Sequence, residues 1–328
     1  MRGPGQTDGR KVGRIALVVY VLLTFALTWT AWIVPAAFLA PSNDGFFGVG
    51  GPVFLLGVSA PAFVALALTA YCEGRAGVAR LLARIGRWQL GARLYLFAIG
   101  YMAAIKLLAA LIHRMAMGAW PAFGDTPLPL MLGAILVSTW MQAGEEVGWR
   151  GYALPRLATH LGLGGASVLL GVVWALWHLP LFFLQGSGSD GQSFPIYLVQ
   201  VTALSVAMSW LYWRALGSLL LVMLMHASVN NTIGIVPAAV PNAVHPMSLE
   251  GSLVAWATIG VSSVVAAVLL LRMRGAEIGA MLNSGSHPPQ LGQPGVRQPI
   301  LLATADSRGR GPTTDCSGRS AARPAAEP

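Results

Sequence analysis

Residues 127–150 read PLPLMLGAILVSTWMQAGEEVGWR. An almost unbroken apolar stretch runs into three ionisable residues, Glu145, Glu146 and Arg150. A helix of about 20 mostly apolar residues crosses the hydrocarbon core of a bilayer. Ionisable groups are costly at that depth, and where they occur they are functional candidates by default. The stretch therefore predicts a membrane helix that carries chemistry.

Similar apolar stretches recur along the whole chain. The 328 residues are 55% hydrophobic and 10% charged, whereas soluble domains carry about 25% charged residues. Besides 127–149, the expected spans cover residues 14–40, 49–72, 92–117, 163–185, 194–213, 215–235 and 252–271. The sequence predicts an all-α, polytopic membrane helix bundle of about eight transmembrane helices, with polar residues inside the bundle.

The net charge of +9 and the isoelectric point of about 10.3 would suit a nucleic-acid-binding protein. The positions of the charges argue against that class, because basic residues cluster at the ends of spans and in alternate loops. Those loops hold Arg2, Arg10, Lys11 and Arg14, then Arg75, Arg80, Arg84, Arg87 and Arg93, then Arg150 and Arg156, then Arg214, and finally Arg272 and Arg274. The opposite loops hold Arg114 as their basic residue, with Asp44, Asp125, Asp190 and Glu250.

Short loops rich in Arg and Lys stay on the cytoplasmic side of a membrane. We therefore expect a multi-pass protein of the cell inner (plasma) membrane with both termini in the cytoplasm and with loops near residues 44, 122, 190 and 243 outside. Residues 73–91 alternate apolar and Arg positions, which is typical of an amphipathic helix on an anionic membrane surface, although a solvated loop would fit as well.

Three segments follow from this pattern. Residues 1–13 form a cytoplasmic N-terminal segment, residues 14–274 a membrane domain with its chemistry at 140–235, and residues 275–328 a tail rich in Gly, Pro, Ser and Arg. Such a tail buries too little apolar surface to fold, so we expect disorder. Cys72 and Cys316 fit neither a metal-binding spacing nor a disulfide framework.

The two glutamates are expected to differ. Residues four apart share a helix face, so Glu146 and Arg150 form an intrahelical ion pair, while Glu145 points away, on the side of Trp149. A carboxylate without a cation partner suits a general base that works near neutral pH. The alternative is that both glutamates pair with Arg150 and have a structural role.

Two more spans carry polar pairs at one-turn spacing. Trp174 precedes His178 by four residues, so the indole can pack on the imidazole, and His226 and Asn230 share a face in the same way. A lone histidine in a bundle is usually a packing residue, whereas this set on three spans favours a site. For Lys106 we favour a snorkelling or structural role.

The three motifs in this order resemble the CPBP family, which includes CAAX prenyl endopeptidases and bacteriocin-processing or immunity proteins. They are Glu145-Glu146-x-x-x-Arg150, Trp174-x-x-x-His178 and His226-x-x-x-Asn230, and the resemblance covers about residues 140–235, with weaker likeness upstream that includes residues 88–95. Trp174 stands where the family motif often has Phe and keeps the aromatic ring.

The resemblance implies an intramembrane endopeptidase. Glu145 would activate water for attack on a peptide carbonyl with help from His178, and His226 and Asn230 would stabilise the oxyanion. Glu146, Arg150 and Trp174 would support these four. This mechanism needs no cofactor. The alternative is a Zn²⁺ site formed by Glu145, His178 and His226, with water as the fourth ligand.

The expected partners are the lipid bilayer and a membrane-associated peptide or protein substrate, and we expect no nucleic acid. Two non-enzymatic functions compete with the endopeptidase. A transporter or proton relay also uses intramembrane Glu and His, but it needs titratable groups that reach both faces. A non-catalytic, immunity-type scaffold would not need the complete motif set. The sequence does not identify the substrate.

Overall fold

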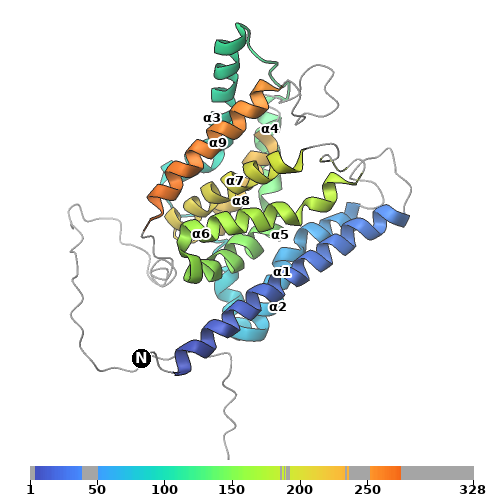
Figure 1. The fold of residues 1–328 in the computed structure, drawn as a ribbon, viewed down its shortest axis with the longest axis vertical. Helices are drawn as coiled ribbons and strands as arrows, with labels where there is room; N and C mark the ends of the chain where they lie inside the picture. Colours follow the sequence, from blue (N-terminus) through green and yellow to red (C-terminus); the bar gives the residue numbers. More distant parts are fainter. Residues whose placement is uncertain are drawn as a thin grey trace, which may run out of the picture.

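The computed structural model describes residues 4–38, 51–184, 187, 189, 193–232, 235 and 252–274 (Figure 1). These residues form helices and connecting segments, and no strand occurs among them. The expected all-α fold is confirmed. The α-helices are α1 (Pro4–Phe38), α2 (Gly51–Leu82), α3 (Ala92–Met117), α4 (Leu128–Met141), α5 (Ala143–Glu146), α6 (Leu154–Trp177), α7 (Phe194–Arg214), α8 (Leu219–Thr232) and α9 (Leu253–Arg272). A π-helix, η2 (Val147–Ala153), joins α5 to α6, and a 3₁₀ turn, η3 (Leu179–Phe182), follows α6.

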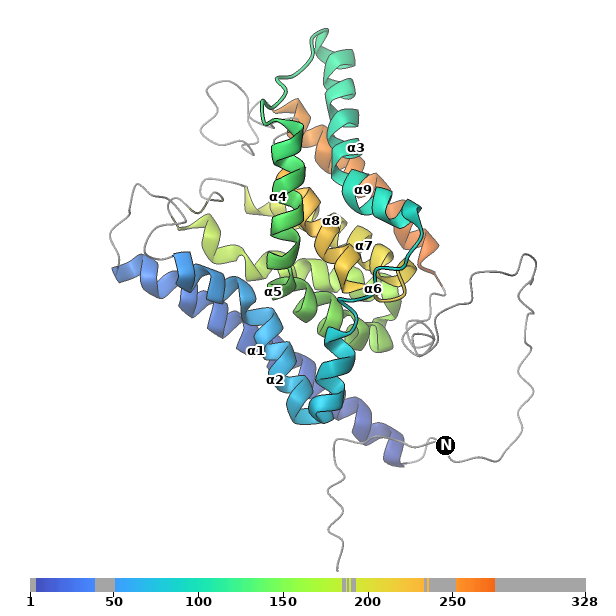
Figure 2. The ribbon, with the colours of Figure 1, turned by 180° about the vertical axis from the view of Figure 1, so that it is seen from behind.

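The helices pack as one bundle around α6, α7 and α8. Helices α1 and α2 lie side by side along one flank, and α3 and α9 pair on the opposite flank, as both ribbon views show (Figures 1 and 2). Helix α6 packs on α7, and α8 contacts both α3 and α4. Helices α5 and η2 contact α2 and α8. The glutamates of the first motif therefore enter the centre of the bundle.

The membrane-spanning character is confirmed, but the expected count of about eight spans is not. Among the described residues, six helical stretches are long and apolar enough to cross a bilayer. One of them, Leu128–Trp177, contains 50 residues and covers most of the fourth expected span, 127–149, and of the fifth, 163–185. Helix α8 has 14 residues, which at 1.5 Å per residue is shorter than the hydrocarbon core of about 30 Å.

Two glycines interrupt helices at the points where the sequence predicts a span to end or begin. Gly74 has φ 66° inside α2, and Gly162 has φ 67° inside α6. Glycine adopts this left-handed region without the steric cost that a Cβ would add. The helical turns after Gly74 cover the expected amphipathic segment, 73–91, only up to Leu82. The helix after Gly162 covers the expected fifth span, 163–185, up to Trp177. Residues 150–161 are helical, where the sequence suggested a loop.

The loops with predicted cytoplasmic arginines meet at one end of the bundle. Arg84 donates to the carbonyl of Gly151 at 3.1 Å and to the hydroxyl of Tyr212 at 3.0 Å. Arg156 pairs with Glu73 at 2.7 Å. These contacts place three of the predicted inner loops together, as one membrane face requires. Which face this is stays a prediction.

Several expectations concern residues outside the described ranges. These are the outer loops near residues 44, 190 and 243 and the tail 275–328. Lys106 lies within α3 with 3% of its surface exposed, so its side chain is buried between helices, which agrees with a structural role and not with snorkelling.

Candidate active site

Polar side chains from α5, η2, α6 and α8 meet in the middle of the bundle. Glu145 is 6% exposed and His226 4%, and Glu146 and Arg150 are fully buried. Buried charges are tolerated when they are paired and hydrogen-bonded. The contacts of each buried polar side chain therefore indicate its role in the site.

Glu146 binds two partners. Its carboxylate accepts hydrogen bonds from Nη1 of Arg150 at 2.9 and 3.0 Å, which confirms the predicted intrahelical ion pair. Its Oε1 also lies 2.8 Å from Nδ1 of His226 in α8. Because a carboxylate oxygen accepts, Nδ1 of His226 carries a proton, and Nε2 is the ring nitrogen left for other contacts. Glu146 thus fixes the orientation of His226.

Glu145 has a different environment. Its Oε2 accepts a hydrogen bond from Nε1 of Trp174 at 2.7 Å, and among the described residues it forms no ion pair. Its charged neighbours are His226, Glu146 and Arg150. The predicted difference between the two glutamates is therefore visible, although the aromatic partner of Glu145 is Trp174 of the next helix. The sequence suggested Trp149, which packs instead on Tyr20 at 5.6 Å and Trp177 at 5.8 Å.

Trp174 is the side chain that connects the groups of the site. Its ring lies 5.2 Å from that of His226 and 5.9 Å from that of His178. The guanidinium carbon of Arg150 lies 4.3 Å from the centre of the same ring, which is a cation–π contact. With its hydrogen bond to Glu145, Trp174 contacts residues of all the motifs. Phenylalanine could not donate that bond.

His178 ends α6, and its ring is held by its own helix. Nδ1 lies 2.9 Å from the carbonyl oxygen of Trp174. A carbonyl only accepts, so Nδ1 is protonated and Nε2 carries the lone pair in the neutral ring. The ring packs edge-on against Trp177 at 4.6 Å and Tyr197 at 5.6 Å.

The two asparagines of α8 differ in their contacts. Asn231 donates to Oγ of Ser138 in α4 and to the carbonyl of Ala227, each at 2.8 Å. Asn230 is exposed, and within the described part of the chain no hydrogen bond of its side chain is seen. Its amide is therefore uncommitted, one turn beyond His226, whereas Asn231 holds two helices together.

The alternative zinc site has suitable donors. His178 and His226 both direct Nδ1–H to an oxygen and leave Nε2, which is how zinc-binding histidines are usually oriented. However, across the described ranges no three His, Cys, Asp or Glu side chains come together as a metal-binding group. In this arrangement Glu145, His178 and His226 are not gathered as the ligands of one zinc ion.

Sequence reasoning gave too small a role to Trp174 and missed Tyr197. The spacing to His178 indicated Trp174 as a packing partner, but its bond to Glu145 crosses between helices. Tyr197 packs on His178 and interacts electrostatically with Glu145. It lies in α7, outside the three motifs, and local spacing offers no signal for it.

Comparisons with known proteins point in one direction. Residues 124–232 match the protein family described as Rce1-like, type II CAAX prenyl endopeptidase. Over 227 residues the chain is 25% identical to CAAX prenyl protease 2 of Methanococcus maripaludis. The aligned region covers 65% of this chain and 82% of the relative. The family suggests an intramembrane endopeptidase.

The matched region includes α4 to α8 and all seven motif residues. Apart from Asn230, which is exposed, the fold gathers these residues around Trp174 and Glu146. The resemblance expected from the motifs is therefore confirmed: this chain is similar to the Rce1-like CAAX prenyl endopeptidases across the part that holds its buried polar site.

Proposed function

We propose that this protein is an intramembrane endopeptidase that hydrolyses a peptide bond of a membrane-associated substrate with Glu145 as the general base. The observation that carries the proposal is the contrast between two adjacent buried glutamates. Glu146 is neutralised by Arg150 and bound to His226, whereas Glu145 is held by one neutral donor. One carboxylate, that of Glu146, is enough to form the ion pair with Arg150. A second carboxylate that forms no ion pair among the described residues is suited to proton transfer.

In the proposed reaction, Glu145 and His178 act on water. Trp174 binds Oε2 of Glu145, so Oε1 is the oxygen that would accept a proton from a water molecule. Nε2 of His178 carries a lone pair and would orient the same water. The hydroxide adds to the peptide carbonyl carbon, and the proton then passes to the departing amine as the C–N bond breaks.

His226 and Asn230 would stabilise the negative charge on the carbonyl oxygen. Glu146 holds Nδ1 of His226 at 2.8 Å, and in its protonated form His226 would donate an N–H from Nε2. The uncommitted amide of Asn230 supplies a second donor. Donors held in place in a site of low dielectric constant are worth several kcal/mol in the transition state, about 2.7–4 kcal/mol for one donor.

The test is a comparison of membrane peptides by mass spectrometry. Cells that produce the wild-type protein should contain cleavage products that are missing in cells with equal amounts of the Glu145→Gln variant. The same comparison would identify the substrate. Identical peptide sets would contradict the proposal and would favour a relay or a scaffold.

The metal-free mechanism has its own test. Purified protein should keep its activity after strong chelation and contain less than stoichiometric zinc by elemental analysis, because Glu146 binds His226 and Trp174 binds Glu145 directly. Activity that disappears on chelation and returns with added Zn²⁺ would make Glu145, His178 and His226 zinc ligands.

We also propose that the end of the bundle with Arg84 and Arg156 faces the cytoplasm, together with both termini, in the inner membrane. The support is the charge asymmetry of the loops. A cysteine at position 83, in a variant without Cys72 and Cys316, should react with a membrane-impermeant reagent only after the cells are opened. Labelling of intact cells would reverse the orientation.

A further inference from the structure

A second group of buried polar atoms lies behind Glu146, on the side of α1. It consists of Tyr20 and Thr24 from α1 and Trp149 and Arg150 from η2, each fully buried. Arg150 uses Nη1 for Glu146. Its Nε and Nη2, together with Nε1 of Trp149 and the hydroxyls of Tyr20 and Thr24, lack a hydrogen-bond partner among the described residues. We call these four residues the α1–η2 polar cluster.

The members of the cluster are close neighbours. The rings of Tyr20 and Trp149 meet edge to face at 5.6 Å. The Tyr20 hydroxyl lies near the Thr24 hydroxyl, and Tyr20 interacts electrostatically with Glu146 and Arg150. A Cβ on Gly148 would lie 2.4 Å from the Tyr20 hydroxyl, so this glycine lets the hydroxyl approach the backbone of η2.

One helical turn further along α1, a threonine and a tryptophan of the same kind have hydrogen-bond partners within the protein. Nε1 of Trp177 donates to the Thr28 hydroxyl at 2.8 Å, and that hydroxyl donates to the carbonyl of Gly57 at 2.8 Å. Threonine at position 28 thus completes a buried network without any added group. Thr24 has the equivalent position one turn earlier but does not satisfy Trp149.

Leaving the cluster unpartnered would be expensive. A buried donor or acceptor without a partner costs about 1–3 kcal/mol. A bond between the Tyr20 and Thr24 hydroxyls would satisfy one donor and leave the three nitrogens of Trp149 and Arg150. All three nitrogens donate, so the cluster needs small polar molecules that accept from nitrogen and also bond to hydroxyls. A water molecule accepts two hydrogen bonds, so more than one water is needed for all three nitrogens.

Charge decides which molecule fits. The guanidinium charge of Arg150 is already balanced by Glu146, so a bound anion would add an uncompensated charge inside the membrane, which is strongly unfavourable. Water is neutral, and it both donates and accepts. Buried waters typically make about three hydrogen bonds to such groups.

We propose that the α1–η2 polar cluster is a binding site for ordered water, held by Arg150, Trp149, Tyr20 and Thr24. The bound water completes the hydrogen bonds of Arg150 and so fixes the Arg150–Glu146–His226 chain from behind. Tyr20 and Thr24 are then positioning residues. Their effect on the reaction rests on the proposed endopeptidase function, but the water site itself does not.

Pulsed X-ray radiolysis of the full-length protein in detergent micelles tests the water site. Hydroxyl radicals form from water in place, so a buried aromatic ring beside bound water is oxidised and a ring in a dry core is not. Trp149 and Trp177 are a matched pair, because both are fully buried with ring centres 5.8 Å apart. They also fall in different tryptic peptides, since Arg150 and Arg156 lie between them.

We expect oxidation of Trp149 and Tyr20 and protection of Trp177. Tyr20→Phe with Thr24→Val should abolish the oxidation of Trp149, and Thr28→Val should leave it unchanged. Equal oxidation of both tryptophans, protection of both, or unchanged oxidation of Trp149 in the double variant would overturn the proposal. The unmodified protein decides the first comparison even if the double variant does not fold.

A kinetic readout separates positioning from general stability. In the proposed endopeptidase, Tyr20→Phe should lower kcat and leave KM unchanged, because the hydroxyl acts through Arg150 and Glu146 on a donor used in the transition state. A change confined to KM would contradict this role. A wild-type protein without peptidase activity that still shows oxidation of Trp149 would overturn the proposed function and leave the water site standing.

Discussion

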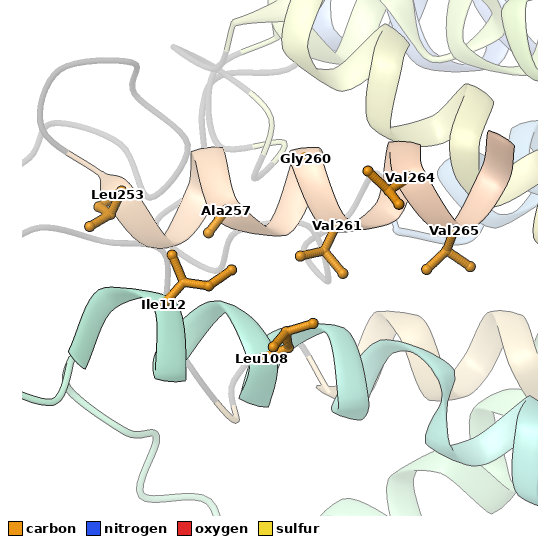
Figure 3. Close-up of a pocket in the computed structure, with 8 residues that line it drawn as sticks. All are labelled: Leu108, Ile112, Leu253, Ala257, Gly260, Val261, Val264 and Val265. Carbon is orange, nitrogen blue, oxygen red and sulfur yellow. The ribbon is translucent and has the colours of Figure 1, made fainter. Parts of the chain in front are cut away.

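The centre of the bundle and the contact between α3 and α9 use opposite chemistry to join helices. At the centre, Glu146, Arg150, His226, Glu145 and Trp174 form a hydrogen-bonded layer that is almost fully buried; we call these five residues the polar layer. Between α3 and α9 lies an open groove of about 420 Å³, lined only by apolar side chains, as Figure 3 shows.

The groove residues are Leu108, Ile112, Leu253, Ala257, Gly260, Val261, Val264 and Val265. Lipid chains are as apolar as these side chains, so the hydrophobic effect gives little reason to close such a contact. The polar layer is different, because each of its members would be costly without its partners. Polar contacts therefore fix positions at the centre, while the α3–α9 contact tolerates loose packing. Substitutions in both regions test that difference.

The largest effect on activity is expected for Glu145→Gln. The amide keeps the shape and the contact with Trp174, but it cannot take a proton, so turnover should fall by the full contribution of the base, about 10²–10⁴-fold. Thermal unfolding in detergent should change little, because no ion pair is lost. A large drop in stability would show that Glu145 belongs to the structural network.

Glu146→Gln should damage both properties. The substitution leaves Arg150 without its counter-charge in the bundle and weakens the hold on Nδ1 of His226. Removing one partner of a buried pair costs about 3–5 kcal/mol. A lower unfolding temperature with reduced turnover is the expected result. If Glu145→Gln and Glu146→Gln reduced turnover equally and neither affected stability, the distinction between the glutamates would be wrong.

Asn230→Ala should reduce turnover by about 10²–10³, the usual loss for one oxyanion donor. Substrate affinity should change much less, because the bond strengthens mainly in the transition state. Asn230→Asp should be no better, since a carboxylate would repel the oxyanion. A silent Asn230→Ala would remove Asn230 from the site.

Asn231 needs a matched control, because it bonds to Ser138 across helices. Asn231→Ala and Ser138→Ala remove the same hydrogen bond from its two ends. Both should lower stability by about 1 kcal/mol and leave turnover nearly unchanged. If Asn231→Ala reduced turnover and Ser138→Ala did not, the catalytic amide would be Asn231.

These contacts show which parts of the site could be predicted from sequence. Spacing within one helix is local geometry, so the Glu146–Arg150 pair and the different position of Glu145 were predictable. The bonds from Trp174 to Glu145 and from His226 to Glu146 join different helices. Their formation depends on how helices pack, which spacing along the chain does not contain.

The fold shows the same limit. Hydropathy predicted membrane helices, but the number of spans was not confirmed. Helix α8 has 14 residues, too few to cross the hydrocarbon core, and the π-helix η2 joins two expected spans into one stretch. Short π-helical segments often occur at functional sites, and η2 directly follows Glu145 and Glu146.

The smallest effects on turnover are expected for two glycines that represent tight and loose helix contacts. Gly171 faces α7, where an added Cβ would lie 2.7 Å from Cα of Thr202. Backbone cannot move aside cheaply, so Gly171→Ala should lower stability by about 1–3 kcal/mol.

Gly260 lines the α3–α9 groove, and nothing lies within 4 Å of the position of its Cβ. Alanine favours a helix over glycine by about 1 kcal/mol, so Gly260→Ala should raise the unfolding temperature slightly and leave turnover unchanged. Thermal unfolding and peptidase assays on both variants would check this. If Gly260→Ala lowered turnover in a stable protein, the groove would take part in the reaction. The polar layer and the groove would then differ in what they bind as well as in how tightly they pack.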